Sequence, residues 1–209
     1  MINSLNSNIS FEGLKENLRL GEGVYKNFKK DFPVVRSNTF VDAKISEHLG
    51  SDKFKKLIPK LKHLEYKYGN GVSTERKQRR GNNFSIPEYI NNLRNVLAEK
   101  KYANCGEQAQ IIQYQLFQKG EKPHIISMLF KYECLGVNMN DHTFTVFGLK
   151  KGAELDNPKT WGNHAVVVDP WANIVMKSSD AIEYFKTKFL FKPERHVIQY
   201  ELSDLINVE

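Results

Sequence analysis

The stretch Tyr102-Ala103-Asn104-Cys105-Gly106-Glu107-Gln108-Ala109 marks the point where a polar, lysine-rich segment gives way to an apolar, periodic one. Asn104 is a favoured N-cap residue, and Glu107, three positions later, completes the pattern of a capping box. Apolar residues then recur at helical spacing for several turns. The sequence therefore predicts a buried helix that starts at Cys105 and is capped by Gly120.

Cys105 would lie in the first turn of that helix. Unpaired N–H groups and the positive end of the helix dipole favour a thiolate there, and the thiolate is the nucleophilic form of cysteine. Gly106 keeps side-chain bulk away from any group that approaches the sulfur. The alternative is a small buried cysteine without chemistry, which is the commoner role of a free cysteine.

Length and composition limit the classes of protein to consider. The chain has 209 residues, of which 40% are hydrophobic, enough for one large domain or for a domain with a helical extension. No apolar run reaches the length of about 18 residues that a membrane span needs, and residues 1–4 lack the pattern of a secretory signal. The chain has two cysteines, Cys105 and Cys134, which are too few for a disulfide scaffold, and a single disulfide between them is kept as an alternative.

The excess of positive charge comes entirely from the N-terminal half. Residues 1–100 hold 19 Lys and Arg against 11 Asp and Glu, a net +8, whereas residues 101–209 hold 12 against 13, a net −1. Four of the cations crowd the segment Arg76-Lys77-Gln78-Arg79-Arg80, the basic run. This charge predicts docking of an acidic partner or membrane surface, or else a solvated polar face. Aromatic residues do not alternate with the cations, so we expect no nucleic-acid binding.

Periodicity along the chain predicts an α+β fold, with helices before and after Cys105 and antiparallel strands beyond. Helices are expected over residues 9–32 (interrupted near Gly21 and Gly23), 40–49, from Asp52, from Ser85 and from Ser179 or Asp180, and strands over residues 123–132, 142–149, 164–169 and 195–202. Residues 67–85 look like a polar loop. We divide the chain into a basic, helical N-terminal region over residues 1–84 and a core over residues 85–209, forming one continuous unit.

Three residues of complementary chemistry fall at the ends of predicted elements. Cys105 starts a helix, His142 starts a strand and Asp169 ends a strand. A thiolate can attack an acyl carbon, an imidazole can hold and return a proton, and a carboxylate can fix the imidazole tautomer. The intervening gaps hold only one or two elements each, so adjacent strands could bring the three side chains together.

Three motifs stand in order along the chain: Asn104-Cys105-Gly106-Glu107-Gln108-Ala109, Asp141-His142-Thr143-Phe144-Thr145-Val146 and Val168-Asp169-Pro170-Trp171. Together they resemble the transglutaminase-like branch of the papain-like cysteine enzymes, in which the order is Cys, His, Asp. The resemblance covers residues 85–175. It implies a papain-like core, in which a Cys-bearing helix packs on an antiparallel sheet behind a helical N-terminal region.

The same resemblance implies Cys105 as nucleophile, His142 as base and Asp169 as the carboxylate that orients it. The implied reaction is thiol-dependent acyl transfer on a protein substrate, as in a transglutaminase or glutamine deamidase, with proteolysis by the same triad as the alternative. The Cys105 N–H would supply half of an oxyanion hole. Asn104, Gly106 and Trp171 would contact the substrate. No cofactor and no metal are implied.

The family's second oxyanion donor is a side chain upstream of the cysteine. The position six residues before Cys105 is Glu99, which accepts rather than donates when ionised. Donors that suit the role by chemistry alone are Asn82, Asn83, Asn92 and Asn95.

Other interpretations compete with the triad. His164 could replace His142 as the base, and Cys105, Cys134, His124 and His142 could form a zinc site, although no C-x-x-C or H-x₃-H pair is present. A protein-binding module that keeps the pocket without catalysis is a further alternative. The high Lys, Asn and Ile content favours a low-GC bacterial source. This composition and the resemblance together suggest a bacterial effector. We expect it to leave the bacterial cytoplasm without a cleavable signal peptide, to enter a host cell and to act on a host protein there.

Overall fold

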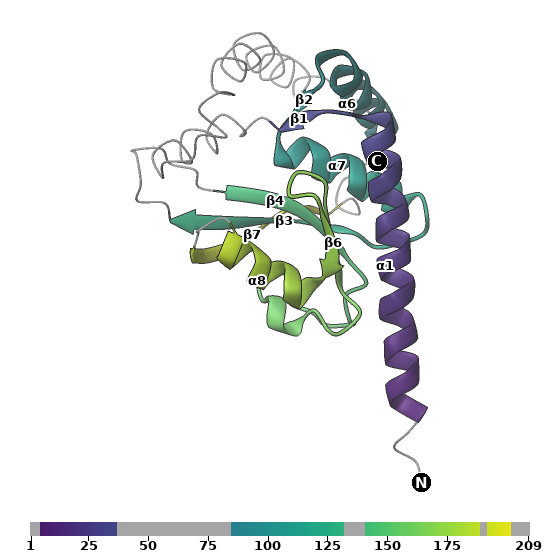
Figure 1. The fold of residues 1–209 in the computed structure, drawn as a ribbon, viewed down its shortest axis with the longest axis vertical. Helices are drawn as coiled ribbons and strands as arrows, with labels where there is room; N and C mark the ends of the chain where they lie inside the picture. Colours follow the sequence, from purple (N-terminus) through teal and green to yellow (C-terminus); the bar gives the residue numbers. More distant parts are fainter. Residues whose placement is uncertain (1–4, 37–84, 132–140, 189–191, 202–209) are drawn as a thin grey trace.

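The computed structural model of the protein describes residues 5–36, 85–131, 141–188 and 192–201 (Figure 1). The helices are α1 (Leu5–Asp31), α6 (Ile86–Lys100), α7 (Cys105–Phe117), the 3-10 turn η2 (Pro158–Thr160) and α8 (Ser178–Lys188). The strands are β1 (Val35–Arg36), β2 (Tyr102–Ala103), β3 (His124–Lys131), β4 (Asp141–Phe147), β5 (Val166–Asp169), β6 (Ile174–Lys177) and β7 (Lys192–Glu201). The helices expected over residues 40–49 and from Asp52, residues 67–84 of the polar loop and the basic run all lie outside the described residues.

Five antiparallel strands form the main sheet in the order β6-β5-β4-β3-β7. The register pairs His142 of β4 with Met128 of β3, and Thr145 of β4 with Val168 of β5. Helix α7 and helix α8 lie on opposite sides of this sheet (Figure 1). Helices packed on an antiparallel sheet confirm the predicted α+β class.

Alternation along β4 divides the core into two hydrophobic clusters. One contains Phe144 and Val146 with Trp171, and also Phe185 of α8. The other cluster contains residues of α7, β5 and α1, and Phe147 is the residue of β4 that belongs to it. Thr145 points toward α7, where its hydroxyl donates a 2.9 Å hydrogen bond to the Ala109 carbonyl. Cys105, the first residue of α7, packs in the first of these clusters.

Helix α1 is continuous from Leu5 to Asp31, so the predicted interruption near Gly21 and Gly23 is wrong. Gly21 marks a close approach of helix to sheet, because a Cβ there would lie 3.0 Å from methyl groups of Val168 and Val175. Burial of apolar side chains farther along α1 offsets the helix cost of the glycines. Those buried side chains are Val24 and Phe28, and Phe32 directly after the helix is buried as well.

The segment before Cys105 is tied to the N-terminal part of the chain. Helix α6 begins after Ser85 with a capping box and ends at Lys100, and its C-cap residue Lys101 has a left-handed φ of 53°. Strand β2 follows at once and pairs in parallel with β1, so that Tyr102 lies opposite Val35. The chain then turns into α7 at Asn104.

Strand β6 was not predicted from the sequence. It follows β5 after a turn over residues 170–173, in which Asn173 has a left-handed φ of 59°. Strand β4 ends at Phe147 rather than at residue 149, and Gly148 directly after it takes a φ of 71°. Helix α7 likewise ends at Phe117, and its C-cap is Gln118 rather than the predicted Gly120.

Candidate active site

Cys105 begins α7, and its surroundings confirm the predicted capping box. The Asn104 side chain accepts a 2.8 Å hydrogen bond from the Glu107 amide, and the Glu107 carboxylate accepts one of 2.8 Å from the Asn104 amide. Cys105 is a free thiol and 9% exposed. The capping box therefore fixes Cys105 as the first residue of α7, and its sulfur lies at the edge of the core.

The first amides of a helix have no carbonyl partner within it. Asn104 takes up the amide of Glu107, which leaves the N–H groups of Cys105 and Gly106 at the positive end of α7. A Cβ on Gly106 would meet only the Asn104 side chain, at 3.5 Å. The start of α7 thus offers backbone donors beside the sulfur, with open space at Gly106.

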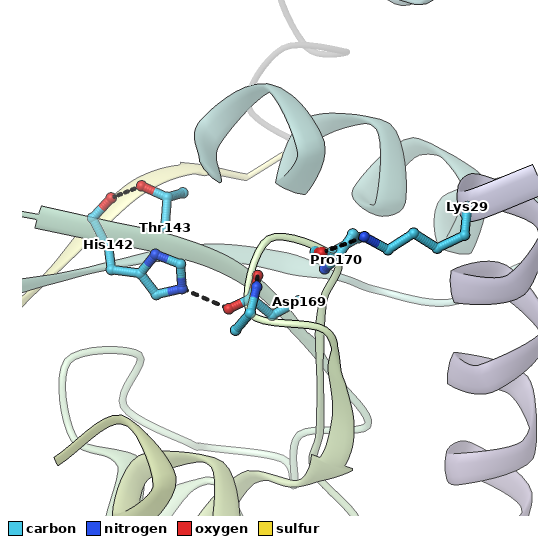
Figure 2. Close-up of polar contacts among 7 residues, drawn as sticks. Lys29, His142, Thr143, Asp169 and Pro170 are labelled. Atoms are coloured by element: carbon cyan, nitrogen blue, oxygen red, sulfur yellow. Dashed lines mark hydrogen bonds and ion pairs between the residues drawn. The ribbon is translucent and has the colours of Figure 1, made fainter. Parts of the chain in front are cut away.

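His142 lies near the start of β4 and is 4% exposed. Its Nε2 makes a 2.5 Å hydrogen bond with Oδ2 of Asp169, as the dashed line in Figure 2 shows. Aromatic rings enclose the imidazole, with centroids at 4.8 Å for Trp171 and 5.2 Å for Phe185. Because Nε2 is engaged by Asp169, Nδ1 is the ring nitrogen left for the Cys105 thiol.

Asp169 is the last residue of β5 and only 1% exposed. Its second oxygen, Oδ1, accepts a 3.0 Å hydrogen bond from the Ala172 amide across the β5–β6 turn. One carboxylate oxygen is thus held by the backbone and the other faces His142. This arrangement fixes the direction in which the negative charge acts.

Electrostatics favour a charged His142. Burial by itself lowers the pKa of the imidazole, but the charge of Asp169, its hydrogen bond and the contact with Cys105 together raise that pKa to about 10. At neutral pH the ring is therefore an imidazolium that donates from both nitrogens. The hydrogen-bonding contact with Cys105 places a proton donor beside the sulfur.

The structure brings Cys105, His142 and Asp169 together from a helix start, a strand start and a strand end. Trp171 packs on His142 but is 2% exposed. The Asn104 side chain is engaged in the helix cap, and Gly106 borders the sulfur without a side chain. Substrate contacts by these last three residues stay a prediction.

Other predicted groups lie elsewhere. His164 precedes β5 at the end opposite Asp169, with its ring against Gly13 of α1. His124 pairs with Val146, at the far end of the β3–β4 ladder from His142. It lines a cavity of about 570 Å³ that is also bordered by Lys122, Lys150 and Lys151. Neither histidine is placed at Cys105.

The upstream oxyanion candidates are not brought to the sulfur by any described contact. Glu99 and Asn95 are exposed on α6, where Glu99 pairs with Lys100 at 2.6 Å, and Asn92 is half-buried. Asn82, Asn83 and Cys134 lie outside the described residues. Within the described ranges, no group of three or more His, Cys, Asp and Glu side chains is arranged to hold a metal ion.

Sequence reasoning missed residues that surround the triad. Phe185 of α8 contacts His142, and it was not singled out as a site residue from the sequence. Tyr25 and Lys29 of α1 approach the Asp169 turn from the N-terminal region, with Lys29 bonded to the Pro170 carbonyl at 2.8 Å. No local signal marks these two contacts from α1, because they join residues more than a hundred positions apart.

Comparison with protein-family models, curated proteins and solved structures finds no match for this chain. None of the helices in the described part of the chain combines the length and the apolar character needed to cross a bilayer. The chemistry of the Cys105 site is therefore the basis on which an activity can be assigned.

Proposed function

We propose that the protein is a thiol enzyme of the papain-like, transglutaminase-like class that works through an acyl-enzyme at Cys105. One observation carries the proposal: His142 contacts Cys105 and also makes a 2.5 Å hydrogen bond to Asp169, within a buried site. A thiol, an imidazole and a carboxylate in series are the groups that nucleophilic acyl transfer requires.

In the first half-reaction the Cys105 thiolate attacks the carbonyl carbon of an amide. The new S–C bond pushes the carbonyl electrons onto oxygen, and the N–H groups at the start of α7 stabilise the resulting oxyanion. As the oxyanion collapses, the C–N bond breaks and the His142 imidazolium gives its proton to the departing nitrogen. A thioester on Cys105 and a neutral His142 remain.

In the second half-reaction an amine or water attacks the thioester carbon. His142 removes the proton of the attacking group, the C–S bond breaks, and the Cys105 thiolate and the imidazolium are restored. Asp169 keeps Nε2 protonated throughout, so that Nδ1 faces the sulfur and the reacting group. An attacking amine gives transamidation, and water gives deamidation or hydrolysis.

We favour the carboxamide of a protein glutamine as the substrate group. Cys105 is 9% exposed and its partners less so, which limits the bulk that can reach the sulfur. A carboxamide at the end of a flexible side chain reaches a recessed thiol without burial of the substrate backbone. Proteolysis uses the same triad and is the second candidate. It requires the site to admit a peptide backbone.

The cellular setting that we propose is a bacterial effector delivered into a host cell to modify a host protein. It rests on composition and on the resemblance of the three motifs. A binding module without catalysis is the non-enzymatic rival. The two differ in the reactivity of Cys105, because a binding module does not need an activated thiol.

The direct test is incubation of the protein with cell lysate and a tagged primary amine, followed by mass spectrometry. We expect tagged glutamines, or glutamines converted to glutamates, with the wild type and none with Cys105→Ala. New peptide termini in place of modified glutamines would favour the protease. No Cys105-dependent product of any kind would reject the enzyme.

A labelling experiment separates enzyme from binding module without a known substrate. With iodoacetamide near pH 7, we expect Cys105 to react faster than Cys134, which serves as a thiol control in the same chain. Replacement of His142 by Ala should slow the labelling of Cys105 and leave Cys134 unchanged. Equal, slow labelling of both cysteines would support the binding module.

A further inference from the structure

The N-terminal helix α1 follows strand β5 from one end to the other. Before β5, Asn17 donates a 2.9 Å hydrogen bond to the His164 carbonyl. Along the strand, Gly21 lies against Val168. Beyond the strand, Lys29 donates a 2.8 Å hydrogen bond to the Pro170 carbonyl. Helix and strand thus run in the same direction, and the last turns of α1 arrive at the turn that follows Asp169.

Lys29 bonds to the part of that turn that lies beside the residues contacting His142. Figure 2 shows Lys29 reaching from α1 to Pro170, directly beside Asp169. The Pro170 carbonyl belongs to the peptide that leads into Trp171, and the ring of Trp171 lies 4.8 Å from that of His142. The bond from Lys29 therefore engages the peptide that lies between Asp169 and Trp171, the two residues of the turn that contact the imidazole.

Tyr25, one helical turn before Lys29, gives independent support for this proximity. The Lys29 ammonium lies 5.7 Å from the centroid of the Tyr25 ring. Burial and, secondly, the negative charge of Asp169 raise the pKa of the Tyr25 hydroxyl. Two successive turns of α1 thus face the carboxylate end of the triad.

We propose that Lys29 is a positioning residue of the active site, which orients Asp169 and Trp171 against His142 through its bond to the Pro170 carbonyl. Helix α1 then belongs to the framework of the triad and is more than a docking region for a partner. The kinetic consequence rests on the proposed function, whereas the geometric consequence at His142 does not.

The test compares three variants of the full chain. Lys29→Met keeps the aliphatic stem and removes the donor, Lys29→Arg keeps a donor, and Lys26→Met is the matched control. Lys26 lies on the same helix, is exposed and pairs only with Glu22 among the contacts described. On a protein substrate we expect Lys29→Met to lower kcat about 10- to 100-fold with KM little changed, because small misplacements of catalytic groups cost that much. Lys29→Arg should recover most of the loss.

A second readout does not depend on turnover. The proton on Nε2 of His142, held by Asp169, is followed by NMR in histidine-labelled protein. We expect its resonance to shift or broaden in Lys29→Met and to keep its wild-type position in Lys29→Arg and Lys26→Met. If Lys29→Met does not fold, Lys29→Gln, which is polar but shorter, takes its place with the same expectation.

The two readouts separate two failures. A changed His142 resonance in a protein without any Cys105-dependent chemistry would reject the proposed function and keep the positioning role. An unchanged resonance and unchanged kcat in Lys29→Met would overturn the positioning role. Loss of thermal stability with an unaltered His142 resonance would also overturn it, because Lys29 would then be a structural contact alone.

Discussion

Replacing Asp169 by Asn tests the electrostatics of the site with almost no change in shape. The side-chain oxygen of the introduced asparagine can still accept the hydrogen bond from the Ala172 amide, which measures 3.0 Å in the wild type. The group facing His142 then becomes a neutral NH₂ donor in place of a carboxylate oxygen. A donor opposite Nε2 forces the imidazole to carry its proton on Nδ1, toward the sulfur.

The expected change in the pKa of His142 is large. In the wild type that pKa is about 10, although burial alone would lower it from 6.5. Without the charge and the hydrogen bond of Asp169, we expect it to fall well below the wild-type value, because burial lowers the pKa and only the contact with Cys105 still raises it. The wild-type pKa lies about 3.5 above 6.5, which corresponds to about 5 kcal/mol of net stabilisation of the imidazolium, and Asp169 is the largest favourable contributor to it.

NMR titration of histidine-labelled protein measures this directly, with His142→Ala used to assign the resonance. We expect His142 to titrate near pH 10 in the wild type and at a clearly lower pH in Asp169→Asn. Turnover should fall by about 10⁴-fold, as loss of a tautomer-fixing carboxylate does in other triads. Asp156→Asn, which neutralises an exposed aspartate, should alter neither quantity. A His142 that still titrates near pH 10 in Asp169→Asn would refute the electrostatic argument.

The remaining predictions concern stability and docking. Because the folded pKa of His142 lies above its unfolded value, the stability it contributes is present in full below pH 6.5 and is lost as the pH rises toward about 10. Urea unfolding of the wild type should show this loss, and Asp169→Asn should not. Gly23→Ala, where a Cβ meets open space, should raise the free energy of unfolding by about 0.5–1 kcal/mol. Gly21→Ala should lower it by about 1–3 kcal/mol, because its Cβ would crowd two valines at 3.0 Å, and equal effects of the two alanines would contradict the close approach. Reversal of the four charges of the basic run to Glu should slow reaction with a protein substrate, most at low salt, and spare a small thiol-reactive ester. Equal loss on both substrates would mean that the run shapes the site itself.

Local chemistry made the start of α7 predictable. The Asn104–Glu107 capping box depends on residues three positions apart, and the structure has both of its hydrogen bonds. The strand positions of His142 and Asp169 followed from alternation and from Pro170, which ends β5. These features are encoded within a few residues, which is why the sequence alone located them.

Features that depend on distant packing were missed or misread. Gly21 looked like a break in α1, because its role is set by two valines of the sheet rather than by its neighbours. Strand β6 is short and follows a turn whose left-handed residue is Asn173 rather than glycine. Lys29 donates to a backbone carbonyl, which any residue type can supply. Neither the composition of the sequence nor the spacing of its residues therefore predicts this contact.

The order of synthesis has a consequence for α1. Helix α1 is synthesised before the strand it packs on: Val24 and Phe28 share a cluster with Val166 and Val168, which are made more than 130 residues later. At a synthesis rate of about 5–20 residues per second, β5 is made on the order of 10 s after α1. During that interval the apolar face of α1 is exposed on the nascent chain. Holdase chaperones that shield such surfaces should therefore raise the yield of folded protein, and α1 should be the segment they occupy.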